Sequence, residues 1–202
     1  MNVSFIGLGK LGLPLACCLA QSGNKILGVD KNEYVLEKLN NQELPFYEPG
    51  LTDIFPDNNF LGFTDSYKRA VEETDASIIL VNTQLGDSGY SAEFVESALT
   101  DLSVNLKKSK KDYHLIILSS TVLPGSIKKL IHLVEKISGR KYEKDFGFSY
   151  VPDFVRLGKV IYDFKNPEFF LVGANNQKDI DITRSIWKNF HDNEPPLKIL
   201  TL

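Results

Sequence analysis

The chain has 202 residues, of which 43% are hydrophobic and 24% charged, a composition typical of a globular protein that is long enough to bury a core. A formal net charge of −3 gives no reason to expect a nucleic acid as partner, and we interpret the basic cluster Lys107–Lys111 as a solvated loop. No run approaches the roughly 18 apolar residues of a membrane span, so we expect no membrane partner. The two cysteines are neighbours, which is no disulfide framework and favours a reducing, cytoplasmic compartment.

The N-terminal thirty residues predict a strand, a glycine-rich turn, a helix to about Gln21 and a second strand that ends on Asp30. The turn has the pattern G-x-G-x-x-G, with glycines at Gly7, Gly9 and Gly12. In such a pattern the first glycine allows the turn and the second lets backbone N–H groups approach a pyrophosphate. The third lets the helix sit close to the sheet, with its N-terminus facing the phosphates. Asp30 lies about where a carboxylate meets the adenosine ribose hydroxyls, so the stretch predicts a dinucleotide site.

Predicted strands and helices alternate after Asp30. Helices are expected through residues 35–39, 67–71, 92–107 and 127–137, strands at 60–64, 76–81 and 114–118, and an irregular loop with two prolines at 44–51. Asp65 is expected to cap the second of these helices. The strand at 76–81, expected to be buried on both faces, ends in Asn82-Thr83-Gln84, which a loop continues to Tyr90. The strand at 114–118 ends in Ser119-Ser120-Thr121.

This alternation is typical of an α/β fold with a doubly wound parallel sheet of the Rossmann type. Ligands of such sheets bind beyond the C-terminal ends of the strands. Gly7, Asp30, Thr83 and Thr121 all fall at that edge, and we expect them to converge on one crevice.

The last quarter of the chain adds two predicted strands, at 146–151 and 169–173, and an amphipathic helix through about 180–190. We expect one extended domain over residues 1–202, with a core of about 1–140 and an extension of about 141–202. The final run, Leu197–Leu202, has no cap or charged tail. The chain is therefore expected to be the N-terminal part of a longer protein.

Four segments stand in a characteristic order: Gly7 to Ala16, Glu48-Pro49-Gly50-Leu51, Ser120 to Gly125, and Val151 to Gly158. Together they resemble the NAD-binding domain of the UDP-glucose/GDP-mannose (nucleotide-sugar 6-) dehydrogenases, over essentially the whole chain. The resemblance implies a two-step, NAD-dependent oxidation of the C6 alcohol of a UDP- or GDP-sugar to a carboxylate, through an aldehyde and a cysteine-bound thioester. It also implies a part in polysaccharide biosynthesis and a homo-oligomeric full-length enzyme.

The resemblance assigns roles to particular positions. NAD is expected at Gly7, Gly9, Lys10, Leu11, Gly12, Asp30, Lys31, Thr83 and Thr121. Thr121 is also expected to help hold the catalytic water, and Asp153 to stand in the same proton-transfer network. Phe154, Arg156, Gly158 and Lys159 are expected in the loop around the substrate. No metal is expected, and spacing alone gives Glu48 no role.

Two positions depart from the family pattern. Asp153 replaces a glutamate, which withdraws the carboxylate by about one methylene, whereas proton transfer needs heavy atoms within about 3 Å or a bridging water. Leu157 replaces a second glutamate of many members and cannot titrate. For Asp153, capping a helix after Pro152 is the structural alternative.

The nucleophilic cysteine of the family would lie downstream of Leu202. Cys17 and Cys18 fall within the first helix, where we expect them to pack as small apolar side chains. The histidines His114, His132 and His191 lie outside every motif, and none is expected to act as a base.

Two other functions are open at this stage. A 6-phosphogluconate or 3-hydroxyacid type of dehydrogenase shares the Gly-Leu-Gly opening and a similar serine–threonine turn, but explains Glu48–Leu51 and Pro152–Phe154 less well. A non-catalytic NAD-binding module is the other alternative. Asp30 should repel a 2′-phosphate, which predicts NAD over NADP, whereas the neighbouring Lys31 acts in the opposite direction.

Overall fold

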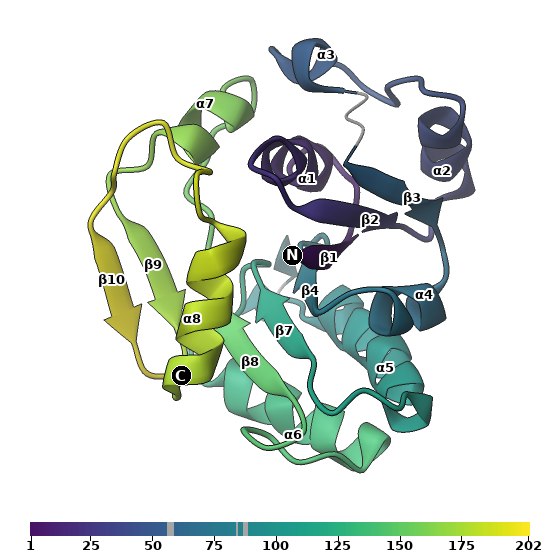
Figure 1. Cartoon of the computed structure of the whole chain (residues 1–202), viewed down its shortest axis with the longest axis vertical. Helices are drawn as coiled ribbons and strands as arrows, with labels where there is room; N and C mark the ends of the chain where they lie inside the picture. Colours follow the sequence, from purple (N-terminus) through teal and green to yellow (C-terminus); the bar gives the residue numbers. More distant parts are fainter. Residues whose placement is uncertain (56–58, 84, 87–88) are drawn as a thin grey trace.

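The computed structural model describes residues 1–55, 59–83, 85–86 and 89–202, and these form one eight-stranded sheet flanked by helices (Figure 1). The strands are β1 (Asn2–Ile6), β2 (Lys25–Val29), β3 (Phe60–Thr64), β4 (Ala76–Ile79), β5 (Leu85–Gly86), β6 (Gly89–Tyr90), β7 (Leu115–Leu118), β8 (Gly147–Tyr150), β9 (Phe170–Gly173) and β10 (Leu197–Leu200). The helices are α1 (Gly12–Gln21), α2 (Glu33–Asn40), α3 (Leu51–Ile54), α4 (Tyr67–Glu72), α5 (Glu93–Lys108), α6 (Ser126–Ser138), α7 (Val160–Lys165) and α8 (Gln177–Ile186).

The large sheet has the strand order β10-β9-β8-β7-β4-β1-β2-β3. Its neighbouring strands are parallel except at β8 and β9, which pair antiparallel. Side chains alternate between two apolar layers: Phe5 belongs to the layer that contains α1, α7 and α8, and Ile6 to the layer that contains α4, α5 and α6. Because both faces are covered, the central strands are apolar throughout. The doubly wound α/β fold predicted from the sequence is confirmed.

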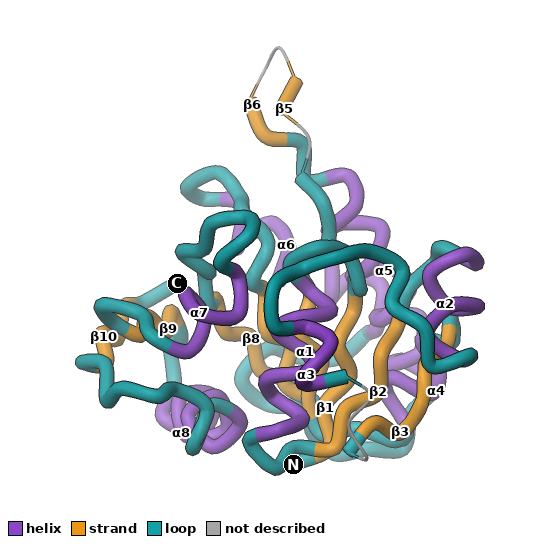
Figure 2. The backbone as a smooth tube through the Cα atoms, turned by 90° about the horizontal axis from the view of Figure 1, so that it is seen from above, coloured by secondary structure: helices purple, strands orange, loops and turns teal. Residues whose placement is uncertain are grey.

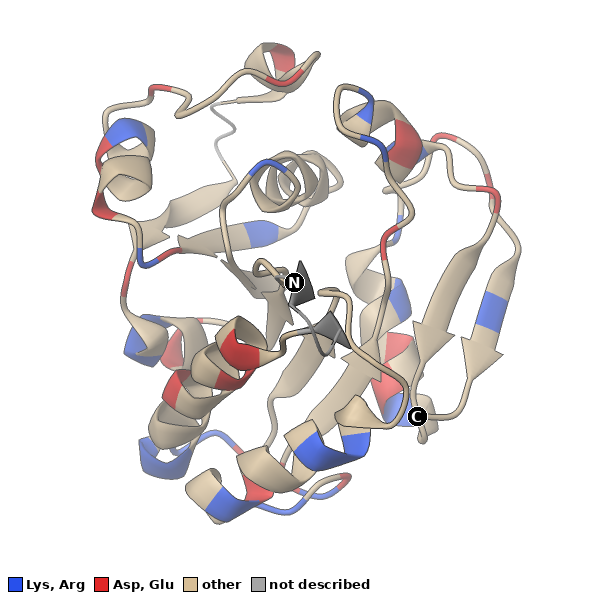
Figure 3. Cartoon of the chain, turned by 180° about the vertical axis from the view of Figure 1, so that it is seen from behind, with Lys and Arg blue, Asp and Glu red and all other residues tan. Residues whose placement is uncertain are grey.

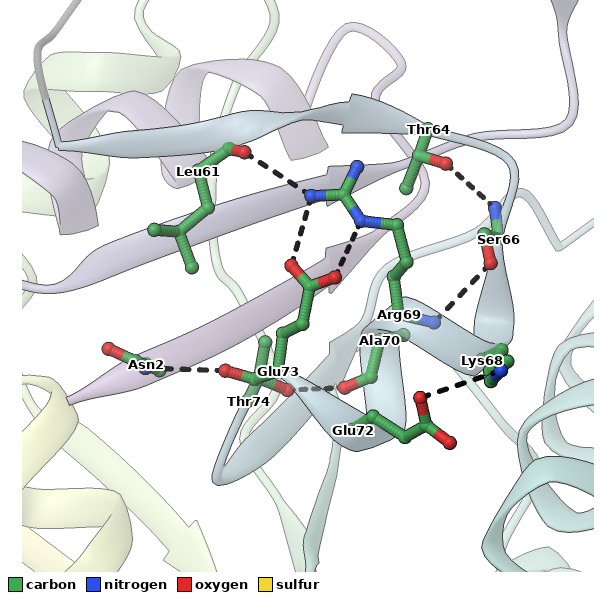
Figure 4. Close-up of polar contacts among 10 residues, drawn as sticks. All are labelled: Asn2, Leu61, Thr64, Ser66, Lys68, Arg69, Ala70, Glu72, Glu73 and Thr74. Carbon is green, nitrogen blue, oxygen red and sulfur yellow. Dashed lines mark hydrogen bonds and ion pairs between the residues drawn. The ribbon is translucent and has the colours of Figure 1, made fainter. Parts of the chain in front are cut away.

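Helix α4 shows where one local prediction is wrong. Its N-cap is Ser66, not Asp65: the Oγ of Ser66 accepts from the N–H of Arg69 at 3.3 Å (Figure 4). The Thr64 hydroxyl in turn accepts from the N–H of Ser66 at 3.1 Å. The extended backbone that an N-cap requires is therefore found at Ser66, one residue later than expected.

The Arg69 guanidinium then ties α4 to the sheet. It donates to the Glu73 carboxylate at 2.7 and 2.9 Å and to the carbonyl of Leu61, on β3, at 3.4 Å (Figure 4). The helix is thereby held against the strand that precedes it.

The structure also contains elements that the sequence pattern did not indicate. Helix α7 and strand β10 were not expected, and residues 152–156 form no helix, so Asp153 is not a helix cap. Strands β5 and β6 pair antiparallel within the expected loop and project from the rest of the chain (Figure 2). Gln84, at the end of the polar segment predicted after β4, lies outside the described residues.

The C-terminal elements are joined to the sheet by Asp179, a buried carboxylate on α8. It accepts from the Tyr113 hydroxyl at 2.5 Å, the N–H of Phe148 at 3.2 Å and the side-chain amide of Asn176 at 2.8 Å. A Cβ at Gly147 would lie 2.0 Å from the same carboxylate, so only glycine lets α8 approach β8 this closely. Both carboxyl oxygens of Asp179 are therefore hydrogen-bonded, which offsets the cost of burying a polar group.

Basic and acidic residues are interspersed along the described elements (Figure 3). The Arg140 side chain donates to the carbonyls of Ser109 and Lys111, within the basic cluster Lys107–Lys111, and to that of Leu106 just before it. None of the helices in the described part of the chain has the length and apolar character needed to cross a membrane.

Candidate functional site

A cavity of about 440 Å³ lies at the C-terminal ends of β1, β2 and β4. Helices α4 and α5 form its other wall. The residues that line it are Ile6, Gly7, Gly9, Val29, Asp30, Lys31, Asn32, Tyr67, Leu80, Val81, Asn82, Phe94, Ser97 and Ala98. It is the crevice in which a doubly wound sheet binds its ligands.

Glycine stands at positions 7, 9 and 12 of the turn for different physical reasons. Gly7 has a φ of +99°, and a Cβ there would lie 2.4 Å from the carbonyl oxygen of Leu80. A Cβ at Gly12 would lie 1.9 Å from the carbonyl oxygen of Gly7, so packing excludes any side chain at both positions. A Cβ at Gly9 would meet no protein atom within 4 Å. Packing therefore does not require glycine at position 9, and the absence of a side chain leaves its backbone open to the cavity that it lines.

The N-terminus of α1 completes this turn. No side chain in the described chain caps it, and its first turn carries no acidic residue. In its first turn the N–H groups of Leu13 and Leu15 donate to the carbonyls of Gly9 and Leu11, and Pro14 has none. The N–H of Gly12 and the positive end of the helix dipole therefore remain available to an anion. These features fit the pyrophosphate of a dinucleotide.

Asp30 is held rigidly at the end of β2. Its Oδ2 accepts from the N–H of Leu8 at 2.7 Å, and its Oδ1 from the N–H of Asn32 at 2.9 Å. Asn32 itself caps α2 by accepting from the N–H of Tyr34 at 3.1 Å. Each carboxylate oxygen keeps a lone pair for a hydroxyl group of a ligand.

The ends of β4 and β7 are joined by Ser120. Its hydroxyl accepts from the N–H of Val81 at 2.8 Å and donates to the carbonyl of Val81 at 2.9 Å. Thr121 follows this contact and is exposed, while Thr83 is half-buried next to Asn82. Of the predicted cofactor residues, Gly7, Gly9, Asp30 and Lys31 line the cavity. Lys10, Leu11, Gly12, Thr83 and Thr121 belong to the adjoining turn and strand ends.

Sequence reasoning missed the far wall of the cavity, formed by Tyr67, Phe94, Ser97 and Ala98. The last three lie on one face of α5, at the spacing i, i+3 and i+4. The available signal in the sequence was Phe94, an aromatic residue in the first turn of the expected helix, which the structure leaves exposed. Only the strand order shows that this helix face meets the end of β2.

Glu48, to which spacing gave no role, is a buried anchor for the predicted substrate loop. It is 5% exposed, and its two oxygens accept from the N–H groups of Gly158, at 3.3 Å, and Val160, at 3.1 Å. It thus binds the first N–H of α7, for which Lys159 supplies no side-chain cap. This one carboxylate therefore holds the loop before α3 against the loop before α7.

A second contact shapes the same loop. The Arg156 guanidinium forms a bidentate pair with Asp163 at 2.6 and 3.0 Å, and the N–H of Arg156 donates to that carboxylate at 2.9 Å. Phe154 and Leu157 are exposed. In the described structure, residues 153–159 do not line the 440 Å³ cavity.

Asp153 points one oxygen into apolar surroundings. Its Oδ2 is buried and has no hydrogen-bond partner among the described residues. The small pocket of about 30 Å³ beside it is lined by aromatic side chains, including Phe164, Phe169 and Trp187. Burial raises the pKa of Asp153 to about 8, so the group is mostly protonated at neutral pH. It can hold a proton, as an acid–base role requires.

The remaining reactive side chains are structural. Cys17 and Cys18 are buried in α1, and burial raises the pKa of the Cys18 thiol to about 12. His114 is buried with its Nε2 2.8 Å from the Ser77 hydroxyl, and burial lowers its pKa to about 3. The described residues contain no group of acidic, histidine and cysteine side chains arranged to hold a metal.

Comparison with known proteins places this geometry in a family. The model of the "UDP-glucose/GDP-mannose dehydrogenase family, NAD binding domain" matches residues 1–191. GDP-mannose 6-dehydrogenase of Pseudomonas putida is 31% identical over 93% of this chain and 44% of its own length. UDP-glucose 6-dehydrogenase of Rickettsia bellii is 32% identical over 100% of this chain and 45% of its own length. The crystal structure of GDP-mannose dehydrogenase from Pseudomonas aeruginosa superposes with a TM-score of 0.91, at 28% identity, over 100% of this chain and 46% of that one. The chain therefore spans less than half the length of these relatives.

Replacing Glu48 by alanine should loosen the loop around Arg156 and Lys159. The substitution leaves two N–H groups without an acceptor, and we expect a loss of about 2–3 kcal/mol in the free energy of unfolding. Trypsin should cleave after Arg156 and Lys159 several times faster than in the unmodified chain. The control Glu43→Ala removes an exposed carboxylate that pairs with Lys38 and should change neither quantity. Equal cleavage rates in the two variants would contradict the anchoring role.

Asp153→Asn should change how stability depends on pH. The carboxyl has a pKa of about 8 in the folded chain against 3.8 for the free group. Between these values the unfolded chain binds fewer protons, so Asp153 makes stability fall as pH rises through this range. The stability gained by Asp153→Asn should therefore grow from about pH 4 to pH 8 and then level off.

Urea unfolding of both proteins across that pH range measures this difference. Asp181→Asn, at an exposed site on α8, is the control and should show a constant offset. Parallel stability curves for Asp153→Asn and the unmodified chain would show that the Asp153 carboxyl titrates like a solvated group.

Proposed function

Because the chain belongs to the UDP-glucose/GDP-mannose dehydrogenase family and matches its NAD-binding domain, we propose that it is the cofactor-binding part of a nucleotide-sugar 6-dehydrogenase. The observation that carries this proposal is the cavity shared by the Gly7–Gly9 turn and Asp30, beside the uncapped N-terminus of α1. The curated relatives act on GDP-mannose and UDP-glucose, which supports a UDP- or GDP-sugar as substrate. The family match includes Glu48–Leu51 and Pro152–Phe154, the segments that the 3-hydroxyacid type explained less well.

The residues present fit the dinucleotide. The open approach at Gly9 and the N–H groups around Lys10, Leu11 and Gly12 would receive the pyrophosphate. Asp30, fixed by the N–H of Leu8, would receive the adenosine ribose hydroxyls. Thr83 and Thr121, at the ends of β4 and β7, would border the nicotinamide, and NAD when bound supplies the hydride acceptor for alcohol oxidation.

We place the acid–base work of the two oxidations, from alcohol through aldehyde to carboxylate, at Thr121 and Asp153. Thr121 would orient the water, and the protonated Asp153 would exchange a proton with it. The loop that carries Phe154, Arg156, Gly158 and Lys159 would lie against the sugar nucleotide. Its anchors at Glu48 and Asp163 support this role, because a substrate loop must be held in a defined conformation.

The thioester step needs a reactive thiol, and both cysteines of this chain are buried in α1. We therefore propose that these residues bind NAD without oxidising the sugar, and that activity belongs to a longer chain with a domain that supplies the cysteine. For that enzyme we propose a homo-oligomer that serves polysaccharide biosynthesis in the cytoplasm. Two adjacent cysteines in 202 residues fit a reducing compartment.

The purified chain should bind NAD in a calorimetric titration, and Gly9→Ala should weaken the binding about tenfold or more. The added methyl group meets no protein atom, so the unfolding midpoint should stay unchanged while the approach to the pyrophosphate is obstructed. With UDP-glucose or GDP-mannose and NAD, the chain should produce no NADH. Absence of NAD binding would overturn the proposed function, and NADH production would overturn the assignment of the nucleophile to a missing domain.

Asp30→Ala should reduce the discrimination between NAD and NADP. The variant loses the charge-assisted hydrogen bonds to the ribose, so NAD should bind about tenfold more weakly, whereas NADP loses a repulsive neighbour. Calorimetry with both cofactors measures the change. Asp75→Ala, just before β4 at the opposite edge of the sheet, removes the same charge and should leave both affinities unchanged. An unaltered NADP-to-NAD ratio in Asp30→Ala would count against the ribose contact.

A further inference from the structure

An ion pair spans the end of the cavity where Asp30 lies. The ammonium group of Lys31 is 2.6 Å from the Asp101 carboxylate and 3.1 Å from the Ser97 hydroxyl, both on α5. It also lies 5.7 Å from the centre of the Tyr67 ring, within cation–π range. The side chain therefore leaves the turn after β2 and crosses to the opposite wall of the cavity.

We propose that Asp101 is a specificity-determining residue for the cofactor, because its pairing with Lys31 keeps that cation from receiving the 2′-phosphate of NADP. The inference rests on the proposed function, since it concerns the dinucleotide site. It assigns the choice between NAD and NADP to two carboxylates, on β2 and α5, rather than to Asp30 alone.

The charges around the cavity support this assignment. Among the described residues that line it, Lys31 is the only lysine or arginine. It directly follows Asp30, where a cation near the ribose would accommodate a 2′-phosphate. A free lysine there would favour NADP and oppose the effect of Asp30. Paired with Asp101, its charge is compensated and its donors are occupied.

Tyr67 gives a second indication that both carboxylates act at the same place. Burial raises the pKa of the Tyr67 hydroxyl, and the charges of Asp101 and Asp30 raise it further. Asp101 therefore lies close enough to the Asp30 end of the cavity to affect the charge there, and its pairing with Lys31 takes place at that end. A 2′-phosphate at this end would need a free cation, whereas the uncharged ribose hydroxyls of NAD would not.

The ion pair is open enough to be changed without disturbing the fold. The side chains of Lys31 and Asp101 are 58% and 42% exposed. Exposed pairs contribute little to stability, so neutral variants should unfold at the same denaturant concentration as the unmodified chain. The effect of such variants can be read from cofactor binding alone.

The test compares the dissociation constants of NADP and NAD for four variants by calorimetry. Asp101→Asn keeps the shape of the side chain, removes its charge and should lower the NADP-to-NAD ratio about fivefold. Lys31→Met alone should not lower the ratio. Lys31→Met combined with Asp101→Asn should restore it toward the value of the unmodified chain. The control Glu96→Gln removes one exposed charge from the same helix and should leave it unchanged.

Ionic strength provides a further readout, because the released Lys31 would act on the phosphate as a partly exposed charge. The gain in NADP binding by Asp101→Asn should shrink as salt is added. A ratio that Asp101→Asn leaves unchanged, with NAD still bound, would overturn the inference while the proposed function stands. A lowered ratio that Lys31→Met does not restore would show direct repulsion by Asp101 and would also overturn the role of the pair. A chain that binds neither cofactor would instead overturn the proposed function.

Discussion

The close approach of the Gly7–Gly12 turn to the sheet is the constraint on which the rest of the site depends. Side chains at either glycine would strike backbone atoms, of Leu80 in one case and of Gly7 in the other. Because both are absent, α1 begins directly above the strand ends, and the N–H of Leu8 reaches the Asp30 carboxylate at 2.7 Å. The anion site at the helix terminus and the acid at the end of β2 thus have a fixed relative position. A dinucleotide needs both groups at this spacing, the helix terminus for its pyrophosphate and the acid for its ribose hydroxyls.

The second half of the described chain is connected to this frame by polar contacts that are distant in sequence. Glu48 lies in the loop before α3, and it binds N–H groups that are 110 and 112 residues further along. Asp179 joins α8 to β8 in a similar way, with Tyr113 as its partner from the segment before β7. Each contact places a buried carboxylate where several donors converge, which stabilises it despite burial. The loop that begins at Asp153 is therefore a fixed part of the structure.

The sequence was sufficient for features that depend on local periodicity or on a short motif. Strand β3 was predicted at its observed bounds, and the turn, α1 and Asp30 lie where the motif required them. Helix α7 was missed because the carboxylate that caps it comes from Glu48 and not from its own N-cap residue. The cap of α4 was assigned one residue early, because Asp65 and Ser66 are both able to cap and only backbone geometry distinguishes them. The cavity wall on α5 and the pairing of Lys31 with Asp101 depend on strand order, which no local pattern encodes.

A crystal structure of the chain with NAD would test the central claim most directly. The account predicts the pyrophosphate at the backbone N–H groups between Gly9 and Gly12, with the adenosine ribose hydroxyls hydrogen-bonded to Asp30 and Lys31 still paired with Asp101. A dinucleotide bound away from this turn, or with its ribose turned away from Asp30, would contradict it.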